Sequence, residues 1–410
     1  MKKILIVGAG YEQIDMISKA FDMGHYVIVA DADPLAPGFE YASESHIIST
    51  TNKEELLKLA SEKQIDAVSY MITETPMESV LYISKSLNLP GPSEESVKAS
   101  QNKNEMRRMF EISEVPGPNF QLISEQDSID YDKLTFPLVI KPSDKAGQIG
   151  LNRVYEPSQL SIAMEKAFKH SSKKEVVIEE YLEGQELNIV IFVQNNRIEL
   201  LTISDRERHP TKSFGVALSH RFPSKYYSDT LYHEIRSLCE KIIKSLNISN
   251  GIVYPQILLK DNCLYVIEVG ERIPGGKMKE VFKLATGYDL VELQLKLSLN
   301  EEIDLEKINQ FKVYKSVFID FLTAKPGILD TGKVLKAEGI EEARNIPNVI
   351  EANYFVNPNE GLEIRPLNTA SDRFFYVITA GDNINQVIEG NKESQNKISF
   401  VVDKSSEVNR

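Results

Sequence analysis

Apolar runs alternate with amphipathic segments along the N-terminal part of the chain. Lys3 to Val7 is an apolar run that ends in the turn Gly8-Ala9-Gly10. Apolar residues then recur at helical spacing from Gln13 to Met23, and Tyr26 to Ala30 is a second apolar run. This order of strand, glycine turn, helix and strand predicts a parallel sheet with crossover helices. Because the Pro90-Gly91-Pro92 segment cannot continue a helix, a first domain is expected to end at residue 92.

Two helical segments and several strands follow. Asn102 to Ile112 has the pattern of the second helix and carries Lys103, Arg107 and Arg108. Taken alone, these cations are expected on a solvated basic face, which is the common fate of such residues. A later apolar strand, Phe136 to Ile140, ends at Lys141, which the polar, glycine-containing loop 143–150 follows. A lysine beside such a loop can neutralise a phosphate, although a surface turn has the same pattern.

The segment from Gly251 to Gly276 has the pattern of a β-hairpin. Asp261 and Asn262 are turn-forming residues with apolar residues on both sides. This arrangement places Gln256 and Glu268 side by side on the two strands. Two such oxygen-bearing side chains can hold Mg²⁺ against phosphates, whereas an ordinary solvated hairpin is the alternative.

The remaining segments suggest three parts in all. The polar stretch from His209 to Lys225 has the composition of an irregular loop over a site. Beyond it, short strands at Gly327–Leu329, Val349–Phe355 and Arg373–Ala380 indicate a small α+β module. The predicted parts are residues 1–92, residues 93–310 with subdomains at about 118–190 and 191–310, and residues 311–410.

Composition excludes several classes of protein. Of the 410 residues, 42% are hydrophobic and 26% are charged, which is typical of a globular protein. With no apolar run of bilayer length and no signal-peptide pattern, a cytoplasmic protein without membrane contact is expected. The net charge of -13 argues against nucleic-acid binding but allows small anionic ligands. Two cysteines, Cys239 and Cys263, supply neither a disulfide framework nor a metal cluster.

The glycine turn near the N-terminus half-matches a dinucleotide-binding fingerprint. Asp31 follows the glycines at about the right distance, but Gln13 stands where a third glycine is expected. One interpretation is therefore an NAD-dependent oxidoreductase. The alternative interpretation is that the glycines only allow the chain to turn tightly.

Taken together and in order, these segments resemble the ATP-grasp superfamily of carboxylate-amine ligases. The resemblance is strongest to the branch with carbamoyl phosphate synthetase, biotin carboxylase and bacterial L-amino acid ligases. The motifs that carry it are NKNEMRRMFEISEVPGPNF, FPLVIKPSDKAGQIG, VVIEEYLEGQE, GIVYPQILLKDNCLYVIEVGERIPGG, KPGIL and ITAGDNINQVIEG. It covers nearly the whole chain and implies an α/β and α+β architecture. That architecture is an ATP-grasp fold with an N-terminal Rossmann-like pre-ATP-grasp domain and a small C-terminal α+β module.

The resemblance also implies a role for individual residues. Lys103 and Lys141 would bind ATP phosphates, under a flap formed by residues 145–150. Glu179 to Leu182 would meet the adenine, and Glu186 would hold the ribose. The implied nucleotide-binding residues are Lys103, Lys141, Lys145, Gly147, Gly150, Glu179, Glu180, Tyr181, Leu182 and Glu186. The implied metal ligands are Gln256 and Glu268, and the implied catalytic residues, at the acyl phosphate, are Arg272, Gly275 and Gly276.

Two positions depart from the commonest pattern of the superfamily. Gln256 stands where a glutamate is usual and matches carbamoyl phosphate synthetase instead. Gly270 stands where most of the superfamily has an asparagine ligand, and L-amino acid ligases resemble this chain in that departure. Water or Glu271 would then complete the ligands of the second Mg²⁺.

The resemblance implies an enzyme that uses ATP and Mg²⁺, with Mn²⁺ as a substitute, to form an amide bond through an acyl phosphate. ADP and phosphate would be released. The substrates would be two amino acids, which give a dipeptide, or an amino acid and a related small amine. One alternative is a ligase or carboxylase that acts on a carboxylate other than an amino acid. Another is an ATP-binding regulatory protein without turnover. Small molecules are the expected partners, together with a second copy of the chain in a homodimer.

Overall fold

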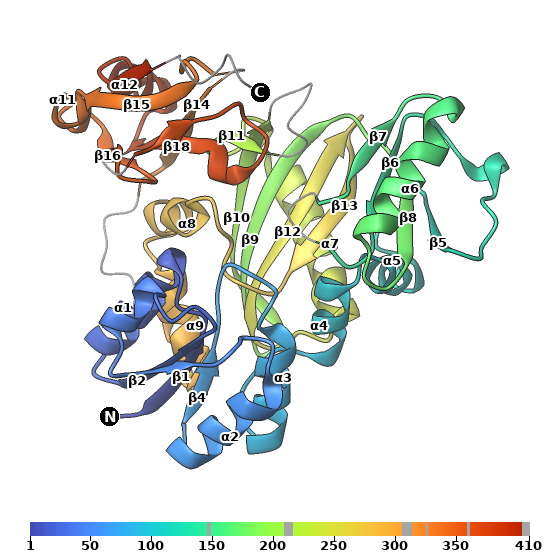
Figure 1. Cartoon of the computed structure of the whole chain (residues 1–410), viewed down its shortest axis with the longest axis horizontal. Coiled ribbons are helices and arrows are strands. Elements are labelled where there is room, and N and C mark those ends of the chain that lie inside the picture. The colour runs from blue at the N-terminus through green and yellow to red at the C-terminus, as the bar shows by residue number, and fades with distance from the viewer. Residues whose placement is uncertain (146–148, 209–215, 306–313, 325–326, 359–360, 404–410) are drawn as a thin grey trace.

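The computed structural model describes residues 1–145, 149–208, 216–305, 314–324, 327–358 and 361–403. The first part of the chain forms a four-stranded parallel sheet in the order β3-β2-β1-β4. The strands are β1 (Lys3–Val7), β2 (Tyr26–Asp31), β3 (Glu44–Ile47) and β4 (Ala67–Ser69). The helices are α1 (Ile14–Asp22), α2 (Lys53–Lys63) and α3 (Met77–Leu87). The predicted parallel sheet with crossover helices is thus confirmed (blue in Figure 1).

The predicted helical segments α4 (Glu94–Gln101) and α5 (Lys103–Ile112) lead into a small antiparallel sheet. Its order is β5-β8-β6-β7. The strands are β5 (Phe120–Ser124), β6 (Leu138–Pro142), β7 (Asn152–Val154) and β8 (Glu175–Glu180), and α6 (Leu160–His170) packs on them. This unit lies to one side of the molecule (green in Figure 1) and carries Lys141 at the end of β6.

An antiparallel sheet of eight strands forms the centre of the molecule, in the order β13-β12-β9-β10-β11-β14-β18-β16. Its first strands are β9 (Gln185–Gln194), β10 (Arg197–Arg208), β11 (Ala217–Phe222), β12 (Gly251–Lys260) and β13 (Cys263–Gly270). Its last three are β14 (Ser316–Thr323), β16 (Val349–Tyr354) and β18 (Arg373–Gly381). Because β11 pairs with β14, the sheet continues from the middle part of the chain into the C-terminal part without interruption.

The helices α7 (Asp229–Ser245), α8 (Met278–Thr286) and α9 (Leu290–Ser298) pack against this sheet, and α9 also packs on α1 and β4. The C-terminal part adds α11 (Ile340–Arg344), α12 (Ile384–Gln395) and a second, three-stranded sheet. That sheet contains β15 (Gly332–Glu338), β17 (Glu363–Ile364) and β19 (Ser399–Asp403).

Two local predictions differ from the structure. The stretch from His209 to Lys225 is not irregular throughout, because residues 217–222 form β11 inside the large sheet. Residues 209–215 of that stretch lie outside the described part. Gly327–Leu329 is not a strand, since only an isolated bridge joins Ala324 to Leu329. The polar side chains of residues 217–222 concealed β11, which is buried by its neighbours and not by its own hydrophobicity.

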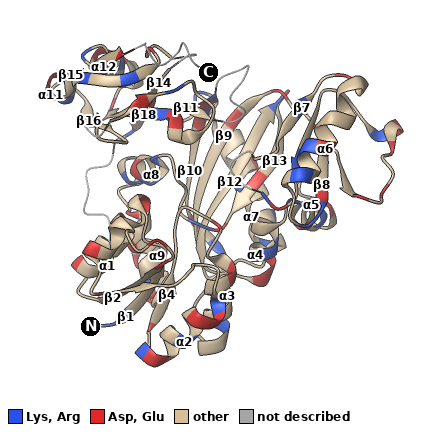
Figure 2. Ribbon diagram, viewed as in Figure 1, with Lys and Arg blue, Asp and Glu red and all other residues tan. Residues whose placement is uncertain are grey.

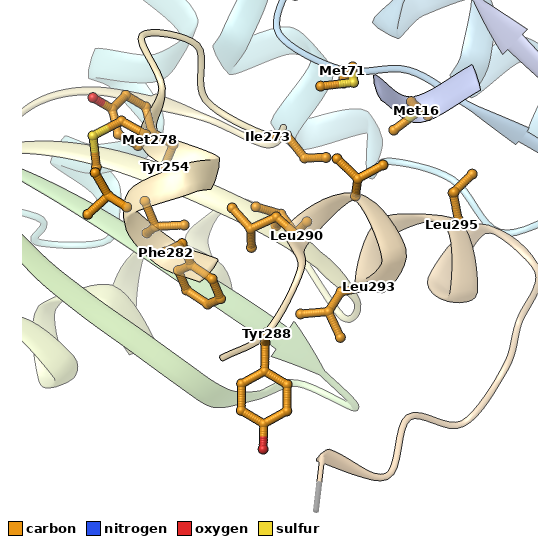
Figure 3. Close-up of a cluster of buried hydrophobic side chains, with 14 of the residues drawn as sticks. Met16, Met71, Tyr254, Ile273, Met278, Phe282, Tyr288, Leu290, Leu293 and Leu295 are labelled. Carbon is orange, nitrogen blue, oxygen red and sulfur yellow. The ribbon is translucent and has the colours of Figure 1, made fainter. Parts of the chain in front are cut away.

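One hydrophobic core joins all three parts of the chain. It combines Met16 and Met71 of the N-terminal part with Phe282 and Leu293 of α8 and α9, as Figure 3 shows. Residues of β14 and β18, among them Val317, belong to the same core.

The helices α2 and α3 of the N-terminal part carry both basic and acidic residues (Figure 2). No helix in the described residues has the length and apolarity to cross a membrane.

Candidate functional site

A cavity of about 310 Å³ lies between the hairpin β12–β13, the small sheet and the N-terminal part. Most of the residues with an implied role line it. They are Lys103, Lys141, Lys145, Glu179, Glu180, Tyr181, Leu182, Glu186, Gln256, Glu268 and Arg272. Gly150, Gly275 and Gly276 are not among its lining residues, and Gly147 lies outside the described residues. The cavity therefore gathers side chains that are up to 198 positions apart, from Glu74 to Arg272.

The hairpin has the predicted register. Gln256 pairs with Glu268 across β12 and β13, and a bulge follows at Ile257. Asp261 and Asn262 have φ values of 49° and 61°, which are the left-handed conformations that a two-residue hairpin turn needs. The turn thus sets the register that puts two oxygen-bearing side chains on the cavity wall.

Glu268 is ionised in this setting. Its carboxylate Oε1 lies 3.3 Å from Lys103 Nζ, and Lys103 is the main cause that lowers the pKa of Glu268, against the effect of burial. Among the described residues, no three His, Cys, Asp or Glu side chains group as a metal site. A Mg²⁺ ion fits here because it commonly takes one or two protein oxygens and completes its shell with phosphate oxygens and water. Gln256 and Glu268 would supply those protein oxygens.

Lys141 is held by a buried ion-pair network. Glu179 accepts hydrogen bonds from Lys141 Nζ at 2.6 Å and from Arg107 Nε at 2.7 Å. Burial acts to raise the pKa of Glu179, but Arg107 and Lys141 outweigh it and lower the pKa to about 2. Arg107 also donates to the main-chain oxygens of Val266 and Ile267 on β13.

This network corrects one prediction. Arg107 is only 1% exposed and does not belong to a solvated basic face, whereas its neighbour Arg108 does project into solvent. Each carboxylate oxygen of Glu179 accepts one hydrogen bond, from Lys141 or from Arg107, so Glu179 holds Lys141 in place at the cavity. The sequence gives no direct signal for Arg107, because burial of a helical arginine depends on the partner that β8 brings.

Part of the cavity wall is apolar. The apolar lining residues are Pro118, Val139, Ile149, Leu151, Leu182, Leu258 and Ile267. The main-chain N–H of Tyr181 already donates to Pro137 O, at 2.8 Å. Arg153 stacks on the ring of Tyr181, with its guanidinium carbon 3.5 Å from the ring centroid. Apolar side chains of this kind suit contact with a purine ring.

Two arginines that sequence reasoning missed lie beside Glu186. Arg206 pairs with Glu186, and Arg208 Nη1 lies 2.9 Å from Glu186 Oε1. Both arginines line the cavity, and Arg206 is directly opposite Glu186 in the register of β9 and β10. The available signal was the pair of arginines at alternate positions where the apolar strand ends, since alternate residues share a face.

Arg272 connects the hairpin to the N-terminal part. Its Nε lies 2.5 Å from Glu74 Oε1. A Cβ atom added at Gly270 would lie 3.4 Å from the same oxygen and 3.6 Å from Arg272 Cγ. A side chain at this position would therefore be in van der Waals contact with the Arg272–Glu74 pair.

Glu271 does not complete a second metal site. Its side chain faces a separate cavity of about 300 Å³, where it accepts a hydrogen bond from Ser96 Oγ. Burial raises the pKa of Glu271 to about 8, so the group is mostly protonated at neutral pH. Successive residues of an extended segment point to opposite sides, which separates Glu271 from Arg272. Of the two suggested completions, Glu271 is excluded by this orientation.

The two glycines after Arg272 lie where the three parts of the chain meet. A Cβ atom added at Gly275 would lie 3.5 Å from Ile72 Cγ2 in the N-terminal part. At Gly276, where φ is +66°, the added atom would lie 3.6 Å from His220 Nε2 and 3.7 Å from Arg373 Nη1. Gly276 thus allows a side chain of β11 and one of β18 to approach the main chain closely.

The space beside the glycine turn near the N-terminus is occupied by the side chain of Gln13. A Cβ atom added at Gly10 would lie 2.9 Å from Gln13 Oε1, and Gln13 Nε2 donates to Met71 O. Asp31 accepts from the main-chain N–H of Ala9 at 2.7 Å. Its partners are therefore internal, and the geometry favours a tight structural turn over an NAD site.

Comparisons with known proteins agree with this geometry. Residues 99–306 match the family described as carbamoyl-phosphate synthase L chain, ATP binding domain, and residues 324–403 match L-amino acid ligase C-terminal domain 2. The chain is 25% identical over 369 residues to the protein y4rH of Sinorhizobium fredii, which covers 86% of this chain and 73% of that one. It is 22% identical to the carbamoyl phosphate synthase large chain of Thermoanaerobacter sp., across 73% of this chain but only 29% of that protein's length.

Solved structures share the fold over the whole chain. The L-amino acid ligase of Bacillus licheniformis has a TM-score of 0.83 at 19% identity, with 98% of this chain and 99% of that chain covered. The phosphoribosylglycinamide synthetase of Anaerococcus prevotii has a TM-score of 0.79 at 18% identity, with 98% and 100% covered. At these identities the likeness shows a common ATP-grasp architecture.

Proposed function

Because the chain belongs to the carbamoyl-phosphate synthase ATP-binding family of ATP-grasp ligases, we propose that it is an ATP-dependent carboxylate-amine ligase that joins two amino acids. The observation that carries this proposal is the cavity itself, where Lys103, Lys141 and Arg272 surround the ligand pair of Gln256 and Glu268. A concentration of cations next to two metal-ligating oxygens suits a nucleoside triphosphate.

The proposed reaction has two steps. An oxygen of the first carboxylate attacks the γ-phosphorus of ATP, the bond to the β-phosphate oxygen breaks, and ADP leaves. The amine nitrogen then attacks the acyl carbon, the bond to the phosphate oxygen breaks, and the amine loses a proton as the amide forms. Activation is needed because a free carboxylate is a poor electrophile, whereas phosphate is a good leaving group.

The side chains of the cavity can act on the charge of the first step. Lys141 is held by Glu179, and Lys103 is held next to Glu268, so both ammonium groups are positioned before nucleotide binds. When bound between Gln256 and Glu268, Mg²⁺, or Mn²⁺ in its place, supplies further neutralisation of the phosphate oxygens. Arg272 would give up its ion pair with Glu74 and bind the acyl phosphate instead.

The proposal that the substrates are amino acids is supported by the C-terminal part of the chain. Residues 324–403 match the L-amino acid ligase domain, and the Bacillus licheniformis enzyme of that name shares the architecture. The Anaerococcus prevotii synthetase, which also shares it, leaves a ligase for another carboxylate as the second candidate. A cytoplasmic location and a homodimer stay predictions.

The direct test is a substrate panel. The purified protein is incubated with ATP, Mg²⁺ and pairs of amino acids, and both phosphate release and the mass of the product are measured. Phosphate release that depends on the pair, together with a dipeptide mass, is the expected result. ATP binding without turnover for any pair would contradict the proposal and favour a regulatory protein. Turnover only with carboxylates other than amino acids would favour the second candidate.

A further inference from the structure

Arg373 brings a cation from the C-terminal part of the chain to the edge of the site. It is the first residue of β18, partly buried, and its guanidinium carbon lies 4.2 Å from the ring centroid of Phe321 and 5.6 Å from that of Phe355. Its Nε donates to Ala370 O at 3.0 Å. The stacking and this hydrogen bond fix the plane of the guanidinium and leave its two terminal nitrogens for another partner.

Most of the other cations around the site are already matched by a carboxylate, whereas Lys145 donates to the hydroxyl of Ser172. Lys103 pairs with Glu268, Lys141 with Glu179, and Arg272 with Glu74, while Arg206 and Arg208 share Glu186. Within the described ranges, Arg373 forms no ion pair with a carboxylate. Burial and the nearby Arg206 lower the pKa of Arg373 to about 10, and Glu12 acts against this from the N-terminal part. A desolvated guanidinium next to a second cation is costly unless an anion joins it.

A second donor points to the same place. Tyr254 donates to Asn188 Oδ1, and Asn188 Nδ2 lies 2.9 Å from His220 Nδ1. With the amide as donor, Nδ1 of the ring accepts and the proton resides on Nε2, which is the nitrogen next to Gly276. Burial lowers the pKa of His220 well below its usual value, so the ring is neutral. Arg373 and His220 both present hydrogen-bond donors at Gly276, whereas Glu12 Oε2 would lie 3.7 Å from a Cβ atom at the neighbouring Gly275.

We propose that Arg373, with His220 beside it, binds the carboxylate of the substrate whose amine attacks the acyl phosphate. A carboxylate matches the fork of a guanidinium and forms two parallel hydrogen bonds with it. This inference rests on the proposed function and extends it, because it names the residue that recognises the amine substrate through its carboxylate.

The position of Gly276 decides which of the two substrates is meant. The resemblance places the acyl phosphate at Gly275 and Gly276, and Arg373 Nη1 would lie 3.7 Å from a Cβ atom at Gly276. In an α-amino acid only one carbon separates the amine from the carboxylate, so an amine at the acyl carbon holds its carboxylate close by. That carboxylate is not consumed and becomes the free carboxylate of the dipeptide.

The test compares an amino acid with its amide as the amine substrate. With the best first substrate from the panel held constant, L-alanine and L-alaninamide are used as probes, and kcat/KM is measured for both. In the unchanged protein, L-alanine is expected to be preferred. In Arg373→Met this preference should fall about 10- to 100-fold through a higher KM for L-alanine, since a hydrogen-bonded charge is lost. Arg373→Lys keeps the charge but not the forked guanidinium, so its preference for L-alanine should lie between those of the unchanged protein and Arg373→Met.

Lys336→Met is the matched control, since it removes an exposed cation of β15 in the same part of the chain. It should leave the preference unchanged. If Arg373→Met keeps the preference, or if only the KM of the first substrate rises, the inference is wrong even though the ligase activity stands. If Arg373→Met does not fold, Arg373→Lys decides by the same ratio. If the unchanged protein forms no amide with any amine, the proposed function itself has failed, and the inference fails with it.

Discussion

At the scale of single residues, buried ion pairs arrange the cations of the site. The network of Lys141, Glu179 and Arg107 is almost fully buried, with side-chain exposures of 9%, 5% and 2%. Removing one partner from such a group leaves a charge without compensation, which costs more than the pair contributes. The network therefore links the position of Lys141 in the cavity to the stability of the fold.

Replacing Arg107 with leucine tests this link. Arg107→Leu should lower the free energy of unfolding by about 3 kcal/mol, because Glu179 and the carbonyls of Val266 and Ile267 lose a buried donor. Arg108→Leu, on the same helix but exposed, should change it by less than about 0.5 kcal/mol. Urea unfolding followed by circular dichroism measures both. Equal effects of the two substitutions would show that the network does not stabilise the protein.

Glu271 should make stability depend on pH. Its pKa is raised to about 8 in the folded protein, whereas the ordinary pKa of a glutamate side chain is 4.5. Between these values the folded state binds a proton that the unfolded state has lost, so stability should fall as pH rises from about 4.5 to 8.

The variant Glu271→Gln removes this titrating group and should flatten the fall in melting temperature over that range. Thermal unfolding from pH 5 to pH 9 measures the effect. Glu234→Gln, on the exposed face of α7, is the control and should keep the slope of the unchanged protein. A slope that Glu271→Gln leaves unaltered would show that another group is responsible.

At the scale of elements, the hairpin β12–β13 organises the site. Its two-residue turn sets the register, the register places Gln256 opposite Glu268, and the end of β13 then delivers Arg272. The cavity is completed by β6 and β8 from the small sheet, which carry Lys141 and Glu179. The nucleotide would thus bind between two antiparallel sheets.

Glu268→Gln should abolish turnover and preserve the fold. The substitution keeps the shape but removes the negative charge that a cation needs, so phosphate release should fall by at least about 100-fold. Circular dichroism and the melting temperature should stay close to those of the unchanged protein. Glu363→Gln, an exposed residue of β17, should retain full activity. Normal turnover in Glu268→Gln would remove this residue from the metal site.

At the scale of the whole molecule, the eight-stranded sheet and one shared core hold the three parts together. β14 pairs with β11 on one side and with β18 on the other, so the C-terminal strands extend the central sheet. The side chains of Val317 and Tyr376 belong to the same core as Met16 of α1. This continuity places Arg373 at the site.

A chain that ends at residue 310 should therefore not fold by itself. It would expose the edge of β11 and the apolar core residues that β14 and β18 cover. Loss of cooperative urea unfolding in the 1–310 fragment is the expected result. Coexpression with residues 311–410 should restore it. A stable 1–310 fragment with a sharp transition would instead support the predicted boundary at residue 311 as one between independent domains.

The sequence alone determined the elements whose signals are local. The parallel N-terminal sheet, the hairpin with its Asp261-Asn262 turn and the helices α4 and α5 follow from periodicity and turn chemistry. The residues of the predicted nucleotide and metal sites follow from the resemblance of short motifs to the ATP-grasp superfamily. Most of them line one cavity, whereas Gly150, Gly275 and Gly276 do not.

Only the tertiary structure decided which charges meet. The burial of Arg107, the pairing of Arg206 and Arg208 with Glu186, and the turn of Glu271 away from the cavity depend on partners far along the chain. The strand β11 and the approach of Arg373 to Gly276 likewise depend on the large sheet. Periodicity reports which face of an element is apolar, but an ion pair between distant residues leaves no mark on the pattern around either one.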